Sequence, residues 1–402
     1  QFTKKYRKEI LEFLIFMQKI LFLHQSSSIG GGSYCLLNII KTLDTNCYKP
    51  IVALMSYGPL VEELSNLDVE VVLFTKMSFF PYNRPIYKVG SIFAYIRLLS
   101  SQQAFKTILN TSKPDIVYFN NMMLAGYLKV AKEFGAKTIC HVREHWPSNE
   151  HILQFTFIRN FVNIYSDRII AINGYSSSIF PKKKATIVYD WINMEKRFEY
   201  MPLEQIFNEN MAGKRVFLFT GGTQIIKGAL EVIKAFSTYR TSAEDRLLLV
   251  GVPPLSSQNK LINYFNRGKH YMGDIYFAIS KDDRIKCMPS VFNLSHIIKQ
   301  SYCNLSYFTI PHANLAMAEC ITLGIPSIAA QTDESLEYSC NGKLAMLYPI
   351  NNFSAFCEKL VRLDNEYSEL KARIDKESNK ITELFDENAN ILRLQSVIKS
   401  LS

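Results

Sequence analysis

The chain has 402 residues, which is long for a single hydrophobic core and sufficient for two domains of ordinary size. Hydrophobic residues make up 48% of it and charged residues 20%, a balance that excludes an intrinsically disordered or fibrous protein. The formal net charge of +10 favours anionic partners such as nucleotide diphosphates or phospholipids. Because the positive charge forms no long stripe, we expect no nucleic-acid partner.

The eight cysteines occur singly, with no Cys-x-x-Cys pair and no cysteine–histidine cluster. This pattern favours neither a zinc site nor a disulfide framework, and it fits a reducing compartment. No run approaches the roughly 18 apolar residues of a membrane-spanning helix. We therefore expect a cytoplasmic protein, with the inner face of the cell membrane as an alternative location.

The segment from Lys4 to Met17 predicts a basic amphipathic helix. Ile10, Phe13 and Leu14 share one helical face, and basic residues crowd the start of the segment. A helix lying on a membrane surface has this pattern, and so has a helix packed on its own domain. Both interpretations stay open, and the first includes a peripheral membrane association.

Short β-rich runs alternate with amphipathic segments of helical length along most of the chain. Most of these runs are continuously apolar, as in strands that crossover helices bury on both faces. The sequence therefore predicts an α/β fold with parallel, doubly wound sheets. The expected strands are Lys19–His24, Pro50–Met55, Val69–Phe74, Asp115–Phe119, Lys137–His141, Arg168–Ile172, Thr186–Tyr189, Arg215–Thr220, Arg246–Val250, Arg284–Met288, Cys303–Tyr307, Pro326–Ala329 and Ala345–Tyr348.

The order of strand, glycine-rich turn and helix begins near Lys19 and again near Arg215. We therefore predict one Rossmann-like domain over residues 1–195 and a second over residues 210–380. A polar segment at about residues 192–212, which contains Pro202, is expected to be the linker. Residues 381–402 are expected to form a C-terminal helix, and crossing back to the first domain is one arrangement for it.

The first glycine-rich turn contains Gly30, Gly31 and Gly32 and directly follows a strand. Glycines let a ligand approach the backbone, and the start of the next helix offers free N–H groups to an anion. The turn matches neither the dinucleotide fingerprint nor a P-loop. A flexible strand-to-helix turn without a ligand is the alternative.

The second glycine-rich turn contains Gly222, Thr223 and Lys227, again between a strand and a helix. A lysine at the start of a helix is well placed to neutralise a departing diphosphate. Because Lys-Gly pairs are common, the position of the turn at the start of the second domain is what favours a functional role.

A further helix is predicted to open near Asn314 and to end at Gly324. Its first amides, near Ala313 and Leu315, are expected to face an anion. Glu319 lies about one and a half turns into this helix, where its carboxylate can accept hydrogen bonds from ribose hydroxyls. A glutamate exposed to solvent is the alternative.

Several short elements, in order, resemble the family 4 glycosyltransferases with the GT-B fold. Gly58-Pro59-Leu60 is similar to the family's Gly-Pro-Leu element, and Pro114-Asp115-Ile116-Val117 to its "PDIVH" strand. The segment at residues 166–171 is similar to its "ADRVIAVS" strand, and residues 188–193 lie where the family often has "NGVD". The resemblance runs from about Gly30 to Tyr348 and implies two Rossmann-like domains that face a cleft.

The resemblance also implies roles for some residues. Lys227 matches the lysine that binds the diphosphate, and Glu319 matches the glutamate that holds the ribose. The chain departs from the family in two places: Pro311 stands where a glutamate touches the donor sugar, and Gly222 stands where an arginine precedes the lysine. Nucleotide binding is therefore better supported than the identity of the sugar.

The segment at residues 141–147 carries titratable groups at the end of a strand of the first domain, where α/β folds place their sites. In proteins of the resembled family this loop lies near the reacting centre. We expect His141 and Glu144, in preference to His145, to act in catalysis. Arg143 and Gly58 are expected to bind the acceptor. An ion pair between Arg143 and Glu144 is the alternative.

Together these features predict an enzyme that transfers a hexose-type sugar from a nucleotide sugar, with retention as the resemblance implies. The expected acceptor is a glycan or a lipid-linked molecule of surface polysaccharide assembly. No Asp-x-Asp element is present, so we expect a reaction without metal or other cofactor. A sugar-nucleotide epimerase of the same fold, a non-catalytic protein that binds nucleotide sugars, and a nucleic-acid-binding protein are the rival hypotheses.

Overall fold

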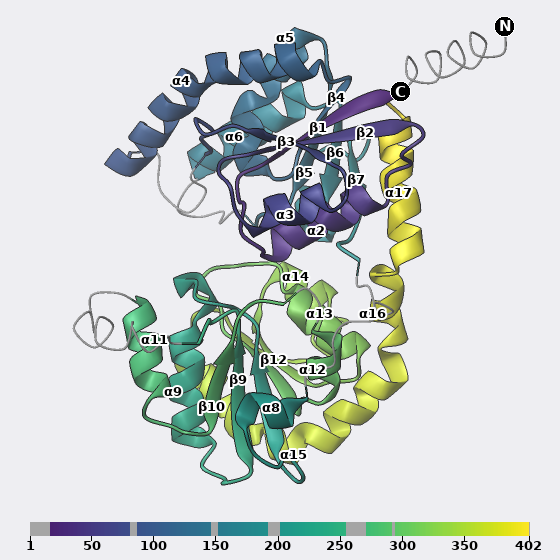
Figure 1. Ribbon diagram of the computed structural model, residues 1–402. Helices are drawn as coiled ribbons and strands as arrows, with labels where there is room; N and C mark the ends of the chain where they lie inside the picture. The colour runs from purple at the N-terminus through teal and green to yellow at the C-terminus, as the bar shows by residue number, and fades with distance from the viewer. Residues whose placement is uncertain are drawn as a thin grey trace, which may run out of the picture. The chain divides into compact units, whose positions relative to one another are not determined.

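The computed structural model describes residues 17–80, 87–145, 152–191, 202–254, 271–291 and 294–401, which fall into two compact units (Figure 1). One unit runs as far as Asp190 and resumes at Asn388, and the other spans Trp191–Glu387. The predicted helix from Lys4 lies outside the described residues except for Met17. Residues 146, 147, 192 and 193 of the family-like segments lie outside them as well.

The first unit is built on a seven-stranded parallel sheet with the order β3-β2-β1-β4-β5-β6-β7. Its strands are β1 (Gln18–His24), β2 (Tyr48–Leu54), β3 (Glu70–Leu73), β4 (Ile116–Phe119), β5 (Lys137–Val142), β6 (Arg168–Ala171) and β7 (Ala185–Ile187). Its helices are α2 (Gly31–Lys41), α3 (Pro59–Ser65), α4 (Val89–Ser112), η1 (Met122–Tyr127), α5 (Leu128–Phe134), α6 (Ile152–Tyr165), α7 (Gly174–Ser178) and α17 (Glu387–Lys399).

The second unit is built on a six-stranded parallel sheet with the order β10-β9-β8-β11-β12-β13. Its strands are β8 (Arg215–Phe219), β9 (Asp245–Val250), β10 (Ile285–Met288), β11 (Cys303–Ser306), β12 (Ser327–Gln331) and β13 (Met346–Pro349). Its helices are α8 (Leu203–Phe207), η2 (Ile225–Lys227), α9 (Ala229–Tyr239), α11 (Tyr271–Ile279), α12 (Ser295–Lys299), α13 (Leu315–Thr322), α14 (Asp333–Glu337), α15 (Phe353–Glu377) and α16 (Asn379–Leu384).

Each predicted strand is present, with ends that differ by at most two residues. The central strands are buried on both faces, as their continuous apolar runs predict: Ile20, Leu21, Phe22 and Leu23 of β1 are all 0% exposed. The two doubly wound parallel sheets confirm the predicted fold class.

The predicted linker at residues 192–212 is wrong in part. Within it, the chain forms α8, which begins directly after Pro202. Leu203 and Phe207 lie four residues apart on one face of α8, and both are buried in the core of the second unit with Val216 and Leu248. The polar composition of the segment led to the prediction of a linker, but this apolar pair packs α8 onto the core of the second unit.

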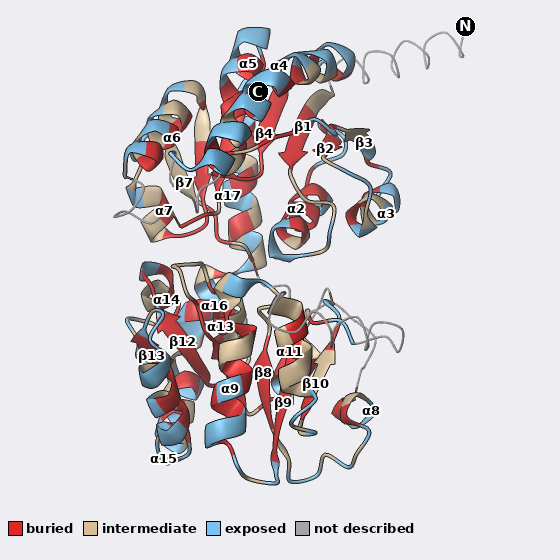
Figure 2. Cartoon of the chain, turned by 90° about the vertical axis from the view of Figure 1, so that its left-hand side faces the viewer, coloured by how far each residue is buried: buried red, intermediate tan, exposed pale blue. Residues whose placement is uncertain are grey.

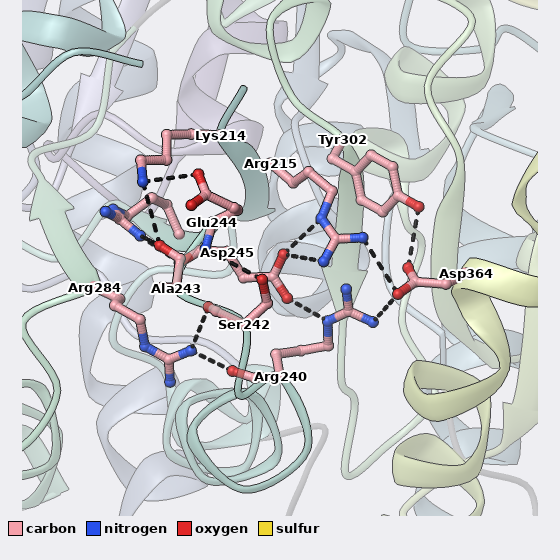
Figure 3. A network of polar contacts seen from close by, with 11 residues as sticks. Lys214, Arg215, Arg240, Ser242, Ala243, Glu244, Asp245, Arg284, Tyr302 and Asp364 are labelled. Carbon is pink, nitrogen blue, oxygen red and sulfur yellow. Dashed lines mark hydrogen bonds and ion pairs between the residues drawn. The ribbon is translucent and has the colours of Figure 1, made fainter. Parts of the chain in front are cut away.

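The amino edge of the second sheet is held by a network of ion pairs around Asp245, the first residue of β9 (Figure 3). The Asp245 carboxylate has no exposed surface and accepts from Arg215 Nε at 2.7 Å and Arg240 Nε at 2.8 Å. Both guanidinium groups also reach Asp364 of α15, which accepts a hydrogen bond from the Tyr302 hydroxyl at 3.1 Å. The network therefore joins β8, β9, α9 and α15 at the end of the sheet opposite the loop that carries Lys227.

The C-terminal helix α17 packs on the first unit. Asn390 Oδ1 accepts a hydrogen bond from the backbone N–H of Tyr189 at 3.0 Å. Gln395 Nε2 donates to the carbonyl oxygen of Thr42, and Ser400, just after the helix, contacts Arg168. Residues far apart in the sequence thus complete one core.

Candidate functional site

In the second unit, the chain reverses its winding direction between β8 and β11, the two central neighbours of the sheet. From β8 the chain goes outward to β9 and β10, and from β11 it goes outward on the other side to β12 and β13. Doubly wound proteins bind ligands at the carboxyl ends of the strands next to such a switch point. The loops after β8 and β11 are therefore where the candidate site is expected.

The loop after β8 depends on glycines at two positions. Gly222 has φ 65° and packs against Gly251, and Gly228 has φ 64°, a left-handed conformation that other residues adopt at a cost. A β-carbon at Gly228 would also lie 2.3 Å from Cδ1 of Tyr307. An arginine at position 222, as in the resembled family, would therefore need another backbone conformation here. Thr223, also predicted as a donor-binding residue, lies in this loop and is partly buried.

Lys227 is the last residue of η2 and is partly buried. Its Nζ lies 4.6 Å from the centroid of the Phe308 ring, and within the described part of the chain it has no hydrogen-bond or ion-pair partner. Burial without a counter-charge lowers the pKa of Lys227 to about 7. The Thr309 N–H donates to the carbonyl oxygen of Ile226 at 3.1 Å, so the loops after β8 and β11 are joined here.

The loop after β11 leads into α13, whose predicted start is confirmed. Asn314 Oδ1 caps the helix by accepting from the Met317 N–H at 3.2 Å, and the buried Nδ2 of Asn314 has no partner in the part of the chain that the structure describes. Ala313 precedes this cap and Leu315 is the first helical residue. The helix ends at Thr322, just before Gly324 with φ 78°.

Glu319 lies in α13 and is partly buried. Its carboxyl group makes no hydrogen bond or ion pair among the residues that the structure describes. Burial raises the pKa of Glu319 to about 7, whereas it lowers that of Lys227 to about the same value. Buried titratable groups with perturbed pKa values and no counter-charge are candidates for a binding site.

The first unit has an equivalent switch point between β1 and β4, and a buried polar network lies at its carboxyl edge. Asn120, just after β4, places its Nδ2 3.0 Å from Nδ1 of His24, the last residue of β1, and 3.2 Å from the carbonyl oxygen of Gly32. Arg143, just after β5, donates from Nε to Asn120 Oδ1 at 3.2 Å. Its Nη1 lies 2.5–2.6 Å from both carboxylate oxygens of Asp190.

This network tests the alternative interpretation of Arg143, an ion pair with Glu144. The guanidinium pairs with Asp190 and not with Glu144, so the alternative ion pair is wrong. Glu144 is buried and accepts backbone hydrogen bonds from Met122 and Arg143 through Oε2. Burial raises the pKa of Glu144 to about 7.

His141 is buried, and its Nδ1 receives hydrogen bonds from two groups. The Tyr118 hydroxyl lies 2.6 Å from Nδ1 and Arg143 Nη2 lies 3.2 Å from it. Because arginine can only donate, Nδ1 is an acceptor and the ring proton is on Nε2. Burial holds the pKa of His141 well below its usual value, and its Nε2 has no hydrogen-bond partner among the described residues. His145 instead stacks on Tyr175 with ring centroids 4.2 Å apart.

The remaining predicted glycines differ in their surroundings. Gly30 precedes α2 and Gly31 begins it, and a β-carbon at either would meet nothing within 4 Å. A β-carbon at Gly58, before α3, would lie 2.6 Å from Ser27 Oγ. Packing against the chain itself is therefore sufficient to require glycine at position 58, whereas it requires none at position 30 or 31.

Sequence analysis missed His24, Asn120 and Asp190 as members of the site. His24 and Asn120 end or follow continuous apolar strands, and a polar residue at that place is the signal that identifies them. In the described ranges, no group of three or more histidine, cysteine, aspartate or glutamate side chains is placed to hold a metal ion. Across the same ranges, no helix has both the length and the apolar content needed to cross a bilayer.

No protein-family model matches the chain, and no curated protein sequence matches it. Its structure is similar to that of HepE from Anabaena in complex with UDP and glucose, with 17% identity, 95% of this chain and 100% of that chain covered, and a TM-score of 0.70. The chain has the GT-B fold.

Two other GT-B structures are similar to it. A glycosyltransferase from Rickettsia africae is 15% identical over 96% of this chain and 98% of its own, with a TM-score of 0.67. The sucrose-phosphate synthase of Thermosynechococcus elongatus is 12% identical over 96% and 99%, with a TM-score of 0.68.

Proposed function

We propose that the protein is a glycosyltransferase that takes a sugar from a nucleotide sugar bound to the second unit. The observation that supports this most directly is the pair Lys227, on the loop after β8, and Glu319, in the helix that follows β11. Both are partly buried, and neither has a hydrogen-bond or ion-pair partner among the described residues. HepE, which has the same fold, was solved with UDP-glucose. The family 4 resemblance adds a retaining mechanism and a hexose-type sugar to the proposal.

In this mechanism the diphosphate lies beside Lys227 and the first amides of α13, near Ala313, Asn314 and Leu315. Positive charge fixed beforehand at that place stabilises the charge that develops on the departing diphosphate. Glu319, further along α13, accepts hydrogen bonds from the ribose hydroxyls. Gly222 and Thr223 shape the loop that holds the lysine. The donor-binding role of Gly30, Gly31 and Gly32 in the first unit stays a prediction.

The acceptor is proposed to bind the first unit near Gly58 and Arg143. Glu144, with a pKa of about 7, is suited to exchange a proton with an acceptor hydroxyl near neutral pH. His141 offers an Nε2–H that can donate a hydrogen bond. We propose a glycan or lipid-linked acceptor in surface polysaccharide assembly, and a reaction that needs no metal, which unchanged turnover in the presence of EDTA would support.

Binding to the donor can be tested by a thermal-shift screen of nucleotide sugars, because a ligand that binds only the folded protein raises the unfolding midpoint. We expect a UDP-sugar to raise it, and Glu319→Ala to weaken the affinity by roughly tenfold or more through loss of the ribose hydrogen bonds. Glu337→Ala, at the end of α14, is the control and should bind as the wild type does. Equal affinity of the Glu319→Ala variant would exclude this carboxylate as the ribose ligand.

The pKa values near 7 predict that affinity for a nucleotide sugar peaks at about pH 7. Above this pH free Lys227 is mostly neutral, so a diphosphate that raises its pKa causes proton uptake, and binding weakens as the pH rises. Below it free Glu319 is mostly protonated, so ribose hydroxyls that lower its pKa cause proton release, and binding weakens as the pH falls. Titration calorimetry in buffers of different ionisation enthalpy measures the proton uptake and the proton release. If binding exchanged no proton at about pH 6 or at about pH 8, the assignment of Lys227 to the diphosphate and of Glu319 to the ribose would be contradicted.

A non-catalytic protein that binds nucleotide sugars is a second candidate. The observation that favours it is the left-handed backbone of Gly222, at the position where the resembled family has arginine. Nucleotide-sugar affinity without release of the nucleotide diphosphate, whatever glycan or lipid-linked acceptor is offered, would support this candidate. Release of the nucleotide diphosphate on addition of acceptor would support the transferase.

A further inference from the structure

The outward face of α4 is apolar in its first half and polar in its second half. Large apolar side chains recur there at helical spacing and are exposed, for example Phe93 at 60% and Leu99 at 72%. The residues buried on the opposite side of the helix include Leu98 and Phe105. The same outward face continues with residues that are all polar and exposed: Gln103, Lys106, Thr107 and Asn110. A surface helix normally has one apolar stripe, which faces the core, so the second stripe has no role in packing this unit.

The apolar half of α4 lies at the carboxyl edge of the first sheet. Ser78 Oγ donates to the carbonyl oxygen of Ala94, and the Phe80 N–H donates to that of Met123 in η1, which directly follows β4. Phe80 also packs between Tyr95 of α4 and Phe157 of α6, with ring centroids 5.3 and 6.3 Å apart. Because α6 follows β5, its first turns also begin at this edge.

We define the α4–α6 surface as Val89, Ile92, Phe93, Ile96 and Leu99 of α4 together with Phe157 of α6, each of which is exposed (Figure 2 shows the outward face of α4 as exposed). Exposed apolar residues gathered in this way mark an interaction site, whereas single ones are ordinary. Phe80 and η1 each contact both α4 and α6, so the two helices are joined through them.

The two helices that form this surface carry charges of one sign only. Between Glu70 and Asp115 the sequence has no acidic residue, while six lysines and arginines occur there. Lys88 and Arg97, both exposed, lie on or next to the apolar half of α4. No acidic residue occurs in α6 either. Apolar side chains that enter the acyl boundary, with basic residues at the phosphate level, are the pattern of a helix lying on an anionic bilayer.

We propose that the α4–α6 surface docks on an anionic lipid bilayer. The apolar residues enter the interfacial region, and Lys88 and Arg97 contact lipid phosphates. This surface is separate from the N-terminal segment, on which the sequence alone based a membrane association. If the proposed transferase function holds, docking brings the carboxyl edge of the first sheet, with Arg143 and Glu144, to the membrane, and the acceptor is then a lipid-linked one.

The experiment is co-sedimentation of the full chain with vesicles of phosphatidylglycerol and phosphatidylcholine in equal parts, without any nucleotide sugar. We expect the wild type to sediment with these vesicles and to bind vesicles of phosphatidylcholine alone more weakly. The triple variant Ile92→Gln, Phe93→Gln, Ile96→Gln is expected to lower the partition coefficient by at least about tenfold. Reversal of charge in Lys88→Glu, Arg97→Glu should cause a similar loss on the anionic vesicles only.

The control is the double variant Val361→Gln, Leu392→Gln, which changes apolar residues of α15 and α17 that are exposed at 54% and 66%. It should sediment like the wild type, and all variants should keep the wild-type unfolding midpoint because their changes are exposed. The proposal is overturned if the wild type does not sediment with anionic vesicles. It is also overturned if Phe13→Gln, Leu14→Gln abolishes binding while the triple variant binds normally.

A third result would assign the surface to another occupant. If sedimentation velocity shows that the triple variant turns a dimer into a monomer while vesicle binding is unchanged, the α4–α6 surface joins two copies of this chain and the proposal fails. These experiments contain no nucleotide sugar, so a loss of vesicle binding says nothing against the nucleotide-sugar site. Likewise, a failure to bind nucleotide sugars would not change the result of the vesicle experiment.

Discussion

Replacement of Lys227 by alanine is expected to lower turnover with a nucleotide sugar by about 10²–10³-fold, the usual cost of removing one preorganised group that stabilises developing negative charge. The loss should fall mainly on kcat, because the charge on the departing diphosphate grows in the transition state. Steady-state release of the nucleotide diphosphate measures it. The stability should be unchanged or slightly higher, since the variant no longer buries an unpaired ammonium group.

Two variants control this experiment. Lys234→Ala removes an exposed lysine of α9, the helix that follows Lys227, and should leave kcat as it is. Lys227→Arg keeps the charge and should recover part of the activity, because arginine also binds phosphate. Wild-type turnover in Lys227→Ala would show that the diphosphate binds elsewhere.

Replacement of Asp245 by asparagine is expected to destabilise the second unit by about 3–5 kcal/mol, because it leaves two guanidinium groups beside a buried neutral amide. Arg240, whose side chain is 6% exposed, has few other ways to be solvated. The free energy of unfolding in urea measures the change, and far-ultraviolet circular dichroism follows the helices of the unit.

Asp364→Asn is the matched control for this second variant. Asp364 contacts the same two arginines but is 43% exposed, so water replaces part of what its carboxylate provides. We expect a loss of about 1 kcal/mol or less for this variant. A similar small loss for Asp245→Asn would mean that the network is not what holds β8, β9 and α15 together.

Much of the second-unit site followed from local sequence patterns. The signals used there operate over a few residues: glycines near the start of a helix, a lysine beside them and an asparagine at a cap position. The asparagine correctly predicted the helix start at Asn314. The left-handed conformation of Gly228 belongs to the same class. The direct contact between the two loops, through Phe308 and Thr309, was outside the reach of such patterns because the residues that touch are about 80 positions apart.

The first-unit site shows the opposite balance. His141 and Glu144 were chosen because they lie at the end of a strand, but their hydrogen-bond partners include Tyr118 and Met122, which come from the neighbouring strand and the turn after it. One interpretation of the sequence paired Arg143 with its neighbour Glu144, whereas in the structure Arg143 pairs with Asp190. A charged side chain pairs with whatever lies near in space, and adjacency in the chain is a poor guide to that.

The sequence by itself determined the strands, the parallel doubly wound class and the glycine turns, because burial on both faces and left-handed backbone leave periodic or local traces in composition. Only the tertiary structure decided that α8 belongs to the second core, that α17 packs on the first unit, and that α4 has a second apolar face. These features depend on which surfaces meet across long sequence separations. A sequence with two apolar stripes predicts a helix buried on both sides, and only the structure shows that one stripe of α4 is exposed.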